Sequence, residues 1–187
     1  MLPEQIAVWA AARGLTLQQS PAGTAVFGAR YTHRYALTRT WEAGTHAVFV
    51  LLNPSEATAY QDDATLRRLV GFARREGHGG LVLANAFAVR SKSPYILDTH
   101  SPAALAATVG EHNDELLQLL AQEAGDVVVG WGIWGRVFSR AAAVEQLLTG
   151  NGARLWALGL TKDGHPRHPL YLAKAAPLTR YEPGVAR

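Results

Sequence analysis

The stretch that decides the fold is AVFVLLNPS, residues 47–55, in which six consecutive apolar side chains run directly into Asn53, Pro54 and Ser55. A continuous apolar run of this length is typical of a strand that is covered on both of its faces. Proline has no N–H to donate to a strand ladder, so the strand should end beside it. We therefore expect a buried strand over residues 47–52, with polar groups at its carboxyl end.

Strands and helices alternate after this stretch. Asp63 is a candidate N-cap for a helix over residues 64–76, in which apolar residues recur at helical spacing. The later elements that the pattern predicts are strands over residues 81–84, 126–129 and 154–158, and helices over residues 108–124 and 137–148. Such alternation indicates a parallel sheet with helices on both sides.

The elements before residue 47 are of a different kind. A short helix is expected over residues 2–12, and two antiparallel strands joined by a tight turn over residues 25–31 and 35–41. The predicted fold class is α/β: one domain over residues 1–187, with three α-β-α layers. Its centre is a mainly parallel four-stranded sheet, and the N-terminal helix and β-hairpin are additions to it.

The composition narrows the classes of protein to which the chain can belong. With 48% hydrophobic and 18% charged residues in 187, the chain should bury one sizeable core. The sequence has no cysteine, which excludes disulfides, thiol nucleophiles and thiolate metal sites. We see neither a signal peptide nor a membrane-spanning run, so a cytoplasmic location is expected. The net charge of +3 permits contact with a polyanion without requiring it.

Polar residues follow each predicted parallel strand. In sheets of this kind, ligands bind beyond the carboxyl ends of the strands. The four segments found there are LLNPS (residues 51–55), LVLANAFAVR (81–90), VVGWGIWG (128–135) and HPRHPLYL (165–172).

Taken in order, these segments resemble the motifs of the uracil-DNA glycosylase superfamily. That superfamily has a Gly-Gln-Asp-Pro-Tyr or Gly-Ile-Asn-Pro-Gly motif after its first core strand, then a Leu-Leu-Asn strand end followed by Val-Arg. A Leu-Trp-Gly strand end and a His-Pro-Ser-Pro loop come next. The resemblance covers residues 47–172, about two-thirds of the chain. The sequence is also similar to a bacterial family of unknown function that has the same Leu-Asn-Pro-Ser and His-Pro-Leu-Tyr-Leu signatures.

The resemblance implies a catalytic role for three residues. Asn53 would position the attacking water, and Asn85 would read the base edge, since a carboxamide is both donor and acceptor. His168 would donate a hydrogen bond to the leaving base, a contribution of about 3 kcal/mol. Because an asparagine cannot act as a base, a neighbouring carboxylate is a candidate helper. The candidates are Asp62, Asp63 and Glu56.

The resemblance also implies a base pocket and a DNA contact. Ser55 stands where the uracil-specific branch has a tyrosine that blocks the pyrimidine 5-position, so a base that is bulky at that position is expected to fit. Further base contacts are expected from Pro54, Tyr60, Phe87 and Trp131. Flanking phosphates would be held by cations, and a side chain would fill the gap left by the flipped nucleotide. The expected DNA-binding residues are Arg90, Lys92, Lys162, Arg167, Leu170 and Tyr171.

Two cofactor hypotheses receive less support from the residues. Gly130, Gly132 and Gly135 spell the G-x-G-x-x-G of dinucleotide-binding turns, but the two tryptophans between them would crowd a pyrophosphate. His165 and His168 have metal-ligand spacing, but prolines follow both of them, which disfavours a helix and a zinc site. We expect neither cofactor nor metal.

The same residues also have plain structural interpretations, which stay open at this point. Asn53 and Pro54 are typical of a turn, Asn85 of a helix cap, His168 of a structural histidine and Asp63 of a cap.

The hypothesis that unites the motifs is a hydrolytic, monofunctional DNA glycosylase. It would flip a pyrimidine, which is expected to be modified at the 5-position, and it would serve in phage defence or base-excision repair. DNA is the expected partner, with no membrane and no obligatory protein partner. The alternatives are a catalytically silent nucleic-acid-binding module of the same fold and a small-molecule nucleoside N-glycosidase. The hypothesis requires Asn53, Asn85 and His168 to converge on one cavity.

Overall fold

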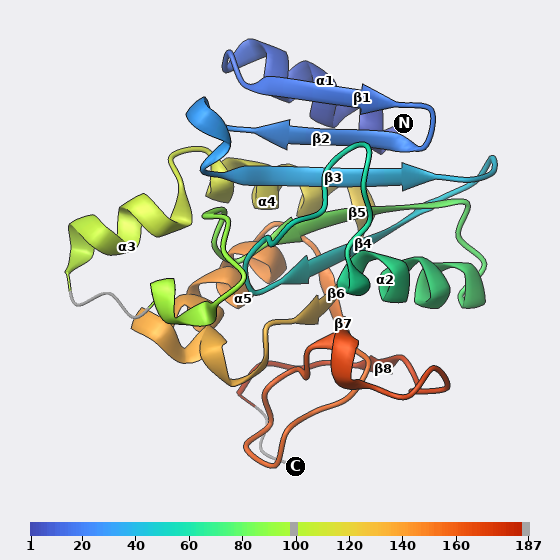
Figure 1. Ribbon diagram of the computed structural model, residues 1–187. Helices are drawn as coiled ribbons and strands as arrows, with labels where there is room; N and C mark the ends of the chain where they lie inside the picture. Colours follow the sequence, from blue (N-terminus) through green and yellow to red (C-terminus); the bar gives the residue numbers. More distant parts are fainter. Residues whose placement is uncertain (98–100, 185–187) are drawn as a thin grey trace.

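The computed structural model describes residues 1–97 and 101–184, and within them it contains one eight-stranded mixed sheet (Figure 1). The strands lie side by side in the order β1-β2-β3-β5-β4-β6-β7-β8. Their bounds are β1 Thr16–Ser20, β2 Gly23–Phe27, β3 Arg34–Thr40, β4 His46–Leu51, β5 Gly80–Asn85, β6 Asp126–Gly130, β7 Arg154–Ala157 and β8 Thr179–Arg180.

The predicted central sheet of four mainly parallel strands is wrong. The expected hairpin is part of the same sheet, since β1, β2 and β3 pair antiparallel and β3 continues antiparallel onto β5. At the other edge, β8 is antiparallel to β7. The reason lies in β3, in which residues 34–39 are all buried: a strand covered on both faces belongs inside a sheet. The mostly polar strand β1, TLQQS, was not predicted because it lacks an apolar pattern.

The other three pairings, β5 with β4, β4 with β6, and β6 with β7, are parallel. From β4 the chain moves to β5 on one side and then returns to β6 on the other side of β4. The strand order therefore reverses between β4 and β6, and such a reversal opens a crevice at the carboxyl ends of the two strands.

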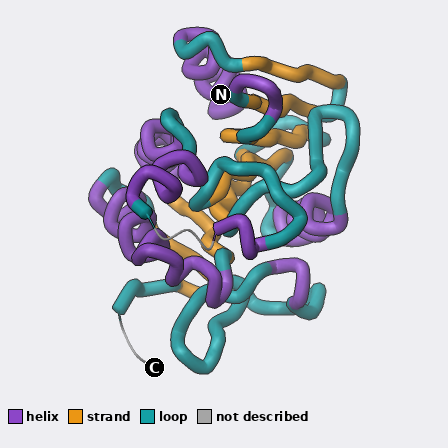
Figure 2. The backbone as a smooth tube through the Cα atoms, turned by 60° about the vertical axis from the view of Figure 1, so that its left-hand side comes forward, coloured by secondary structure: helices purple, strands orange, loops and turns teal. Residues whose placement is uncertain are grey.

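Helices cover both faces of the sheet (Figure 2). One face packs against α1 (Leu2–Ala12), α4 (Asn113–Ala124) and α5 (Arg140–Gly150), and the other against α2 (Ala64–Arg75). Asp63 begins α2 as expected, because its Oδ1 accepts a hydrogen bond from the Leu66 N–H at 2.8 Å.

Two predicted helices have different bounds in the structure. The helix expected over residues 108–124 is divided into α3 (Pro102–Val109) and α4, with Gly110 at a φ of 87° between them. The helix expected over residues 137–148 begins at Arg140, after a 3-10 segment, η3 (Gly132–Ser139). Shorter 3-10 turns are η1 (Ala29–Tyr31), η2 (Pro94–Leu97) and η4 (Pro169–Tyr171). Among the described residues, no helix has both the length and the apolar character needed to span a bilayer.

Candidate functional site

A cavity of about 570 Å³ lies where the strand order reverses. Its lining comes from the segments that follow β4, β5, β6 and β7, and it includes Asn53, Trp131 and His168. Gly130 explains how the last of these segments comes so close to the sheet. A Cβ at that position would lie 2.8 Å from Pro169 Cδ, so only glycine allows the loop to pack against the end of β6.

Asn53 is held so that its oxygen remains available. Its Nδ2 donates to the carbonyl oxygens of Ser91, at 2.9 Å, and Pro54, at 3.2 Å. Both partners are acceptors, which requires the amide nitrogen on that side and the oxygen on the other. Among the described residues Oδ1 has no hydrogen-bond partner. Asn53 therefore contributes a fixed acceptor to the cavity.

His168 contributes a fixed donor. Its Nδ1 accepts the Leu170 N–H at 3.3 Å, so the neutral ring carries its proton on Nε2. Within the described part of the chain, Nε2 has no partner. Burial lowers the pKa of His168 to about 4, and the Asp63 carboxylate offsets only part of that effect. The imidazole is therefore uncharged at neutral pH. Its Nε2–H can donate a hydrogen bond, but the ring carries no second proton with which to act as an acid.

Asn85 does not reach this cavity. It ends β5 beside Leu51 of β4, but it is only 2% exposed and lies outside the cavity lining. Its Oδ1 faces the buried guanidinium of Arg34, with Nη2 at 3.5 Å. The expected convergence thus holds for Asn53 and His168, whereas Asn85 belongs to a buried polar contact beneath the site.

Each carboxylate suggested as a helper already has a hydrogen-bonding or ion-pair partner. Asp62 accepts hydrogen bonds from Arg39 Nε, at 2.9 Å, and Nη2, at 2.7 Å, and lines a separate hollow. Asp63 caps α2 through the bond described above, and Glu56 pairs with Lys92 at 2.7 Å. None of the three carboxylates lines the cavity.

The expected base contacts are divided among several places. Ser55 lines the cavity, as does Trp131. Phe87 is fully buried in the core and cannot stack on a bound base, and Tyr60 lies at the hollow of Asp62. Pro54, too, is buried outside the lining.

Several residues of the cavity were not predicted as base contacts. They are Leu52, Thr65, Ser91, Pro94, Gly132, Trp134 and Thr161. Three of them lay in segments that the sequence had singled out: Leu52 in LLNPS, and Gly132 and Trp134 in the Gly-Trp-Gly-Ile-Trp-Gly motif.

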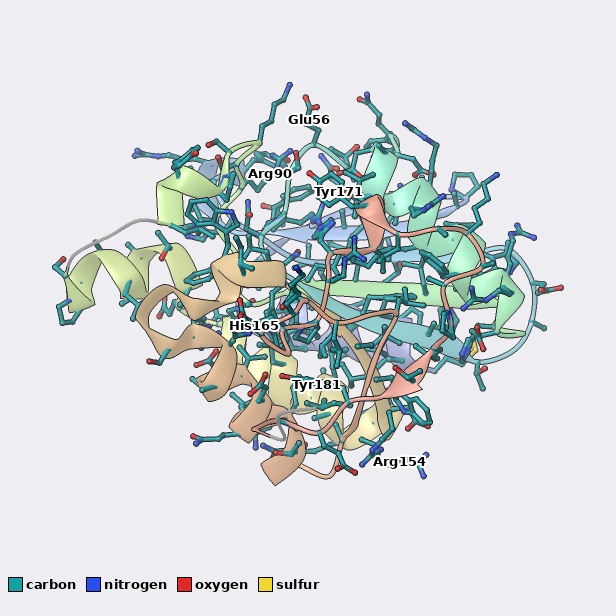
Figure 3. The ribbon with its side chains drawn as sticks, turned by 90° about the horizontal axis from the view of Figure 1, so that it is seen from below. Glu56, Arg90, Arg154, His165, Tyr171 and Tyr181 are labelled. Atoms are coloured by element: carbon teal, nitrogen blue, oxygen red, sulfur yellow. The ribbon has the colours of Figure 1, made fainter. Side chains whose placement is uncertain are left out.

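Four of the six expected DNA-binding residues line the cavity: Lys92, Arg167, Leu170 and Tyr171. Lys162 is exposed but outside the lining. Arg90 has a structural role, because its guanidinium donates to the Ser55 and Tyr31 carbonyls and lies 5.1 Å from the Phe27 ring centroid. In Figure 3, Glu56, Arg90 and Tyr171 lie toward one end of the molecule, and Arg154 projects from another.

The fold and the cavity together define a mixed-sheet protein with a ligand-sized pocket at the point where its strand order reverses. Residues 34–170 match the model of a family described as "Protein of unknown function (DUF1643)", and the chain belongs to this family. The match confirms the expected membership of a family of unknown function, and it contains both Asn53 and His168. No curated protein and no solved structure matches the chain.

Proposed function

We propose that the protein is a hydrolytic DNA glycosylase that acts on a pyrimidine turned out of the DNA stack. One observation carries the proposal: residues far apart in the sequence bring a free acceptor, Asn53 Oδ1, and a free neutral donor, His168 Nε2–H, to the same cavity. Cleavage of an N-glycosidic bond needs both groups, one for the water and one for the departing base.

His168 stabilises the departing base. As the bond between the sugar carbon C1′ and the base nitrogen N1 breaks, its electron pair stays with the base and negative charge develops on the carbonyl oxygen at C2. A hydrogen bond from Nε2 to that oxygen strengthens as the charge grows, and such a donor is worth about 3 kcal/mol. The low pKa of His168 keeps the ring in this neutral donor form throughout the physiological range.

Asn53 positions the water. Its Oδ1 accepts one hydrogen bond from the water, whose lone pair then faces the cationic sugar carbon. A C1′–O bond forms, and the water's remaining proton passes to the departing base anion, which leaves as the neutral base. The step balances without a carboxylate base, in agreement with the occupied positions of Asp62 and Asp63.

The cavity favours a base that is larger than uracil. Its volume of about 570 Å³ exceeds what a pyrimidine ring alone needs, and the small Ser55 stands at one wall. Trp134, which is only partly buried, supplies a ring surface for stacking, whereas Trp131 is 1% exposed and packs in the core. Hypermodified pyrimidines of bacteriophage DNA are therefore the proposed substrates, in a defence role, with base-excision repair as the alternative role.

The surface around the cavity fits a nucleic acid better than a free nucleoside. Lys92 and Arg167 line the cavity and can hold phosphates, and the 76% exposed Tyr171 stands at its edge, where it can fill the gap left by an extruded nucleotide. A nucleoside N-glycosidase has no use for these groups. Binding that weakens steeply with salt supports the DNA substrate, and binding that is indifferent to salt supports the nucleoside.

The direct test is base release. The protein is incubated with DNA that contains either uracil or a 5-substituted pyrimidine, and free base is sought by mass spectrometry. Asn53→Ala and His168→Ala should each lower release by about 100-fold or more while DNA binding persists. If the wild-type protein binds DNA but frees no base, the chain is a silent binding module and the proposal is wrong.

A further inference from the structure

A second hollow, of about 480 Å³, lies beside the cavity. The two share Ser55, Ser91 and Lys92, which form the wall between them. Of these side chains, the two serines are small, and Lys92 is 73% exposed. The wall between the cavity and the second hollow is therefore low. A group that leaves the cavity past Ser55 enters the second hollow.

The second hollow offers mixed chemistry. Arg90, Lys92 and Glu56 bring charges of both signs, and Thr32 and Ser91 bring hydroxyls. Tyr31 and Ile96 supply an apolar flank, and both are 44% exposed. A polar ligand with hydroxyl or amino groups on a carbon frame fits such a lining. A purely apolar ligand would leave the charged groups desolvated and unpaired.

The corner that presents Tyr31 is strained. Arg30 and Tyr31 both have left-handed backbones, with φ of 56° and 57°, a conformation that side chains other than glycine rarely adopt. Arg90 holds the corner through a hydrogen bond from Nη1 to the Tyr31 carbonyl at 3.2 Å, and the Tyr31 ring packs on Phe27 at 5.0 Å. Backbone strain of this kind persists where the surrounding structure enforces it, and it is found preferentially at binding and active sites.

The orientation of a bound pyrimidine follows from the strand order. His168 follows β7, on one side of β4, and the second hollow is built from segments next to β3 and β5, on the other side. In a pyrimidine ring, C5 lies directly across from C2. A base whose C2 oxygen accepts the hydrogen bond from His168 therefore directs C5 away from the β7 side, toward Ser55 and the second hollow.

We infer that the second hollow receives a polar substituent carried on C5 of the pyrimidine, one with hydroxyl or amino groups. The inference rests on the proposed function and narrows its substrate class. Both side chains of the Glu56–Lys92 ion pair are exposed, 58% and 73%, and such solvent-screened pairs contribute little to stability. It can open at little cost, so that Glu56 and Lys92 bond to the substituent instead of to each other.

The test fills the second hollow without touching the cavity. Ile96→Trp adds bulk at an exposed position that lines only the second hollow, and Ile133→Trp, at a position 56% exposed and outside both linings, is the matched control. Base release is measured on DNA strands that carry uracil, a 5-methyl, a 5-hydroxymethyl, a 5-aminoalkyl or an equally long 5-alkyl pyrimidine.

The wild-type protein should prefer the hydroxylated or aminated substituents over the alkyl chain. Ile96→Trp should lower kcat/KM for these polar substrates by about 10-fold or more and leave uracil and 5-methyl release unchanged, since a filled pocket rejects only the larger group. Ile133→Trp should change neither kcat/KM for the polar substrates nor the release of uracil and 5-methyl bases. Glu56→Gln should reduce release of the aminoalkyl base more than release of the hydroxymethyl base.

Equal effects of Ile96→Trp on all substrates, or a wild-type preference for plain uracil, overturn the inference while the glycosylase proposal stands. If no DNA yields free base, the glycosylase proposal fails, and affinity for the same strands, by fluorescence anisotropy, decides the inference separately. Tighter binding of polar 5-substituted strands, lost in Ile96→Trp, then supports the hollow as a receptor. Equal binding of all strands refutes it.

Discussion

Two histidines at opposite ends of the sheet show what separates a structural group from a candidate functional one. His46 begins β4 and His168 lies beyond the carboxyl end of β7. Burial lowers the pKa of both. Among the described residues each ring has one bonded nitrogen, His46 Nε2 with Thr40 Oγ1 at 2.9 Å and His168 Nδ1 with the Leu170 N–H at 3.3 Å, but only His168 lines the cavity. Burial desolvates the ring of both histidines. Only His168 adds an N–H donor that faces the cavity and has no partner among the described residues.

The surroundings of the two histidines differ in the same way. At the amino ends of the parallel strands, Asp126 bonds to Arg154 Nε at 2.8 Å and to Trp156 Nε1 at 2.7 Å. Gly80 there is so close to His46 that a Cβ would lie 2.3 Å from the ring. The backbone is closely packed at that end, and the polar groups named here are paired. The carboxyl end is hollow, and among the described residues Asn53 Oδ1 and His168 Nε2 have no hydrogen-bond partner there, which is why we propose the functional site at that end.

The largest expected effect separates the two histidines directly. His168→Ala should lower kcat for base release by about 10²–10³-fold, because a preorganised donor to the leaving group is lost. His46→Ala should leave kcat unchanged, since it faces no cavity. His168→Gln, which keeps an N–H donor, should recover part of the loss. Single-turnover base release measures all three, and equal losses from His46→Ala and His168→Ala would erase the distinction.

The next effect concerns stability against pH. The pKa of His168 is about 4 in the folded chain, against 6.5 for an ordinary histidine, so between these pH values the unfolded chain binds more protons. The contribution of His168 to the free energy of unfolding should be fully present above pH 6.5. The free energy of unfolding should fall by about 3 kcal/mol as the pH drops toward 4. Urea unfolding of the wild type and His168→Gln from pH 7.5 to 4 measures this loss. The variant should lose correspondingly less, and parallel curves would contradict the assignment.

A smaller effect is expected from substitutions of Asp63, which caps helix α2 and whose charge acts on His168. Asp63→Ala removes the N-cap and should destabilise the protein by about 1 kcal/mol, whereas Asp63→Asn keeps a capping oxygen and should be nearly neutral. Both substitutions should lower the pKa of His168 further, because the Asp63 charge raises it. NMR titration of the His168 ring, with His46 as internal reference, checks this direction. A rise in the pKa would be inconsistent with it.

The smallest effect concerns DNA affinity. Arg167→Ala, at the cavity, should reduce the slope of log affinity against log salt by about 1, as expected for one lost phosphate contact. Arg154→Ala, at the paired end of the sheet, should leave the slope unchanged. Fluorescence anisotropy over a salt series measures both. If the two variants behave alike, DNA does not bind at the cavity end in particular.

Much of the local structure followed from the sequence. The apolar run over residues 47–52 is a buried strand, and the predicted strands beginning at 81, 126 and 154 are β5, β6 and β7. Asp63 caps α2 as predicted. These features depend on side chains within a few positions of each other, and such patterns are visible in a single sequence.

Apart from the bounds of two helices, the errors mostly involve contacts between distant segments. The pairing of β3 with β5 joined the hairpin to the main sheet, and the short polar strand β1 gave no local signal. Phe87, expected at the base, follows β5 into the core. Asn85 and Asn53 both follow apolar strands, and nothing in the chain between them tells which one faces a cavity.

By itself, the sequence determined where the strands end and that asparagine and histidine stand at those ends, because apolar runs and prolines act over a few residues. Only the tertiary structure decided that Asn53 and His168 share a cavity while Arg34 faces Asn85 beneath it, because those outcomes depend on which strands become neighbours. Which strands become neighbours depends on how whole faces of the sheet are buried. That burial is a property of the assembled sheet, and no single segment of the sequence determines it.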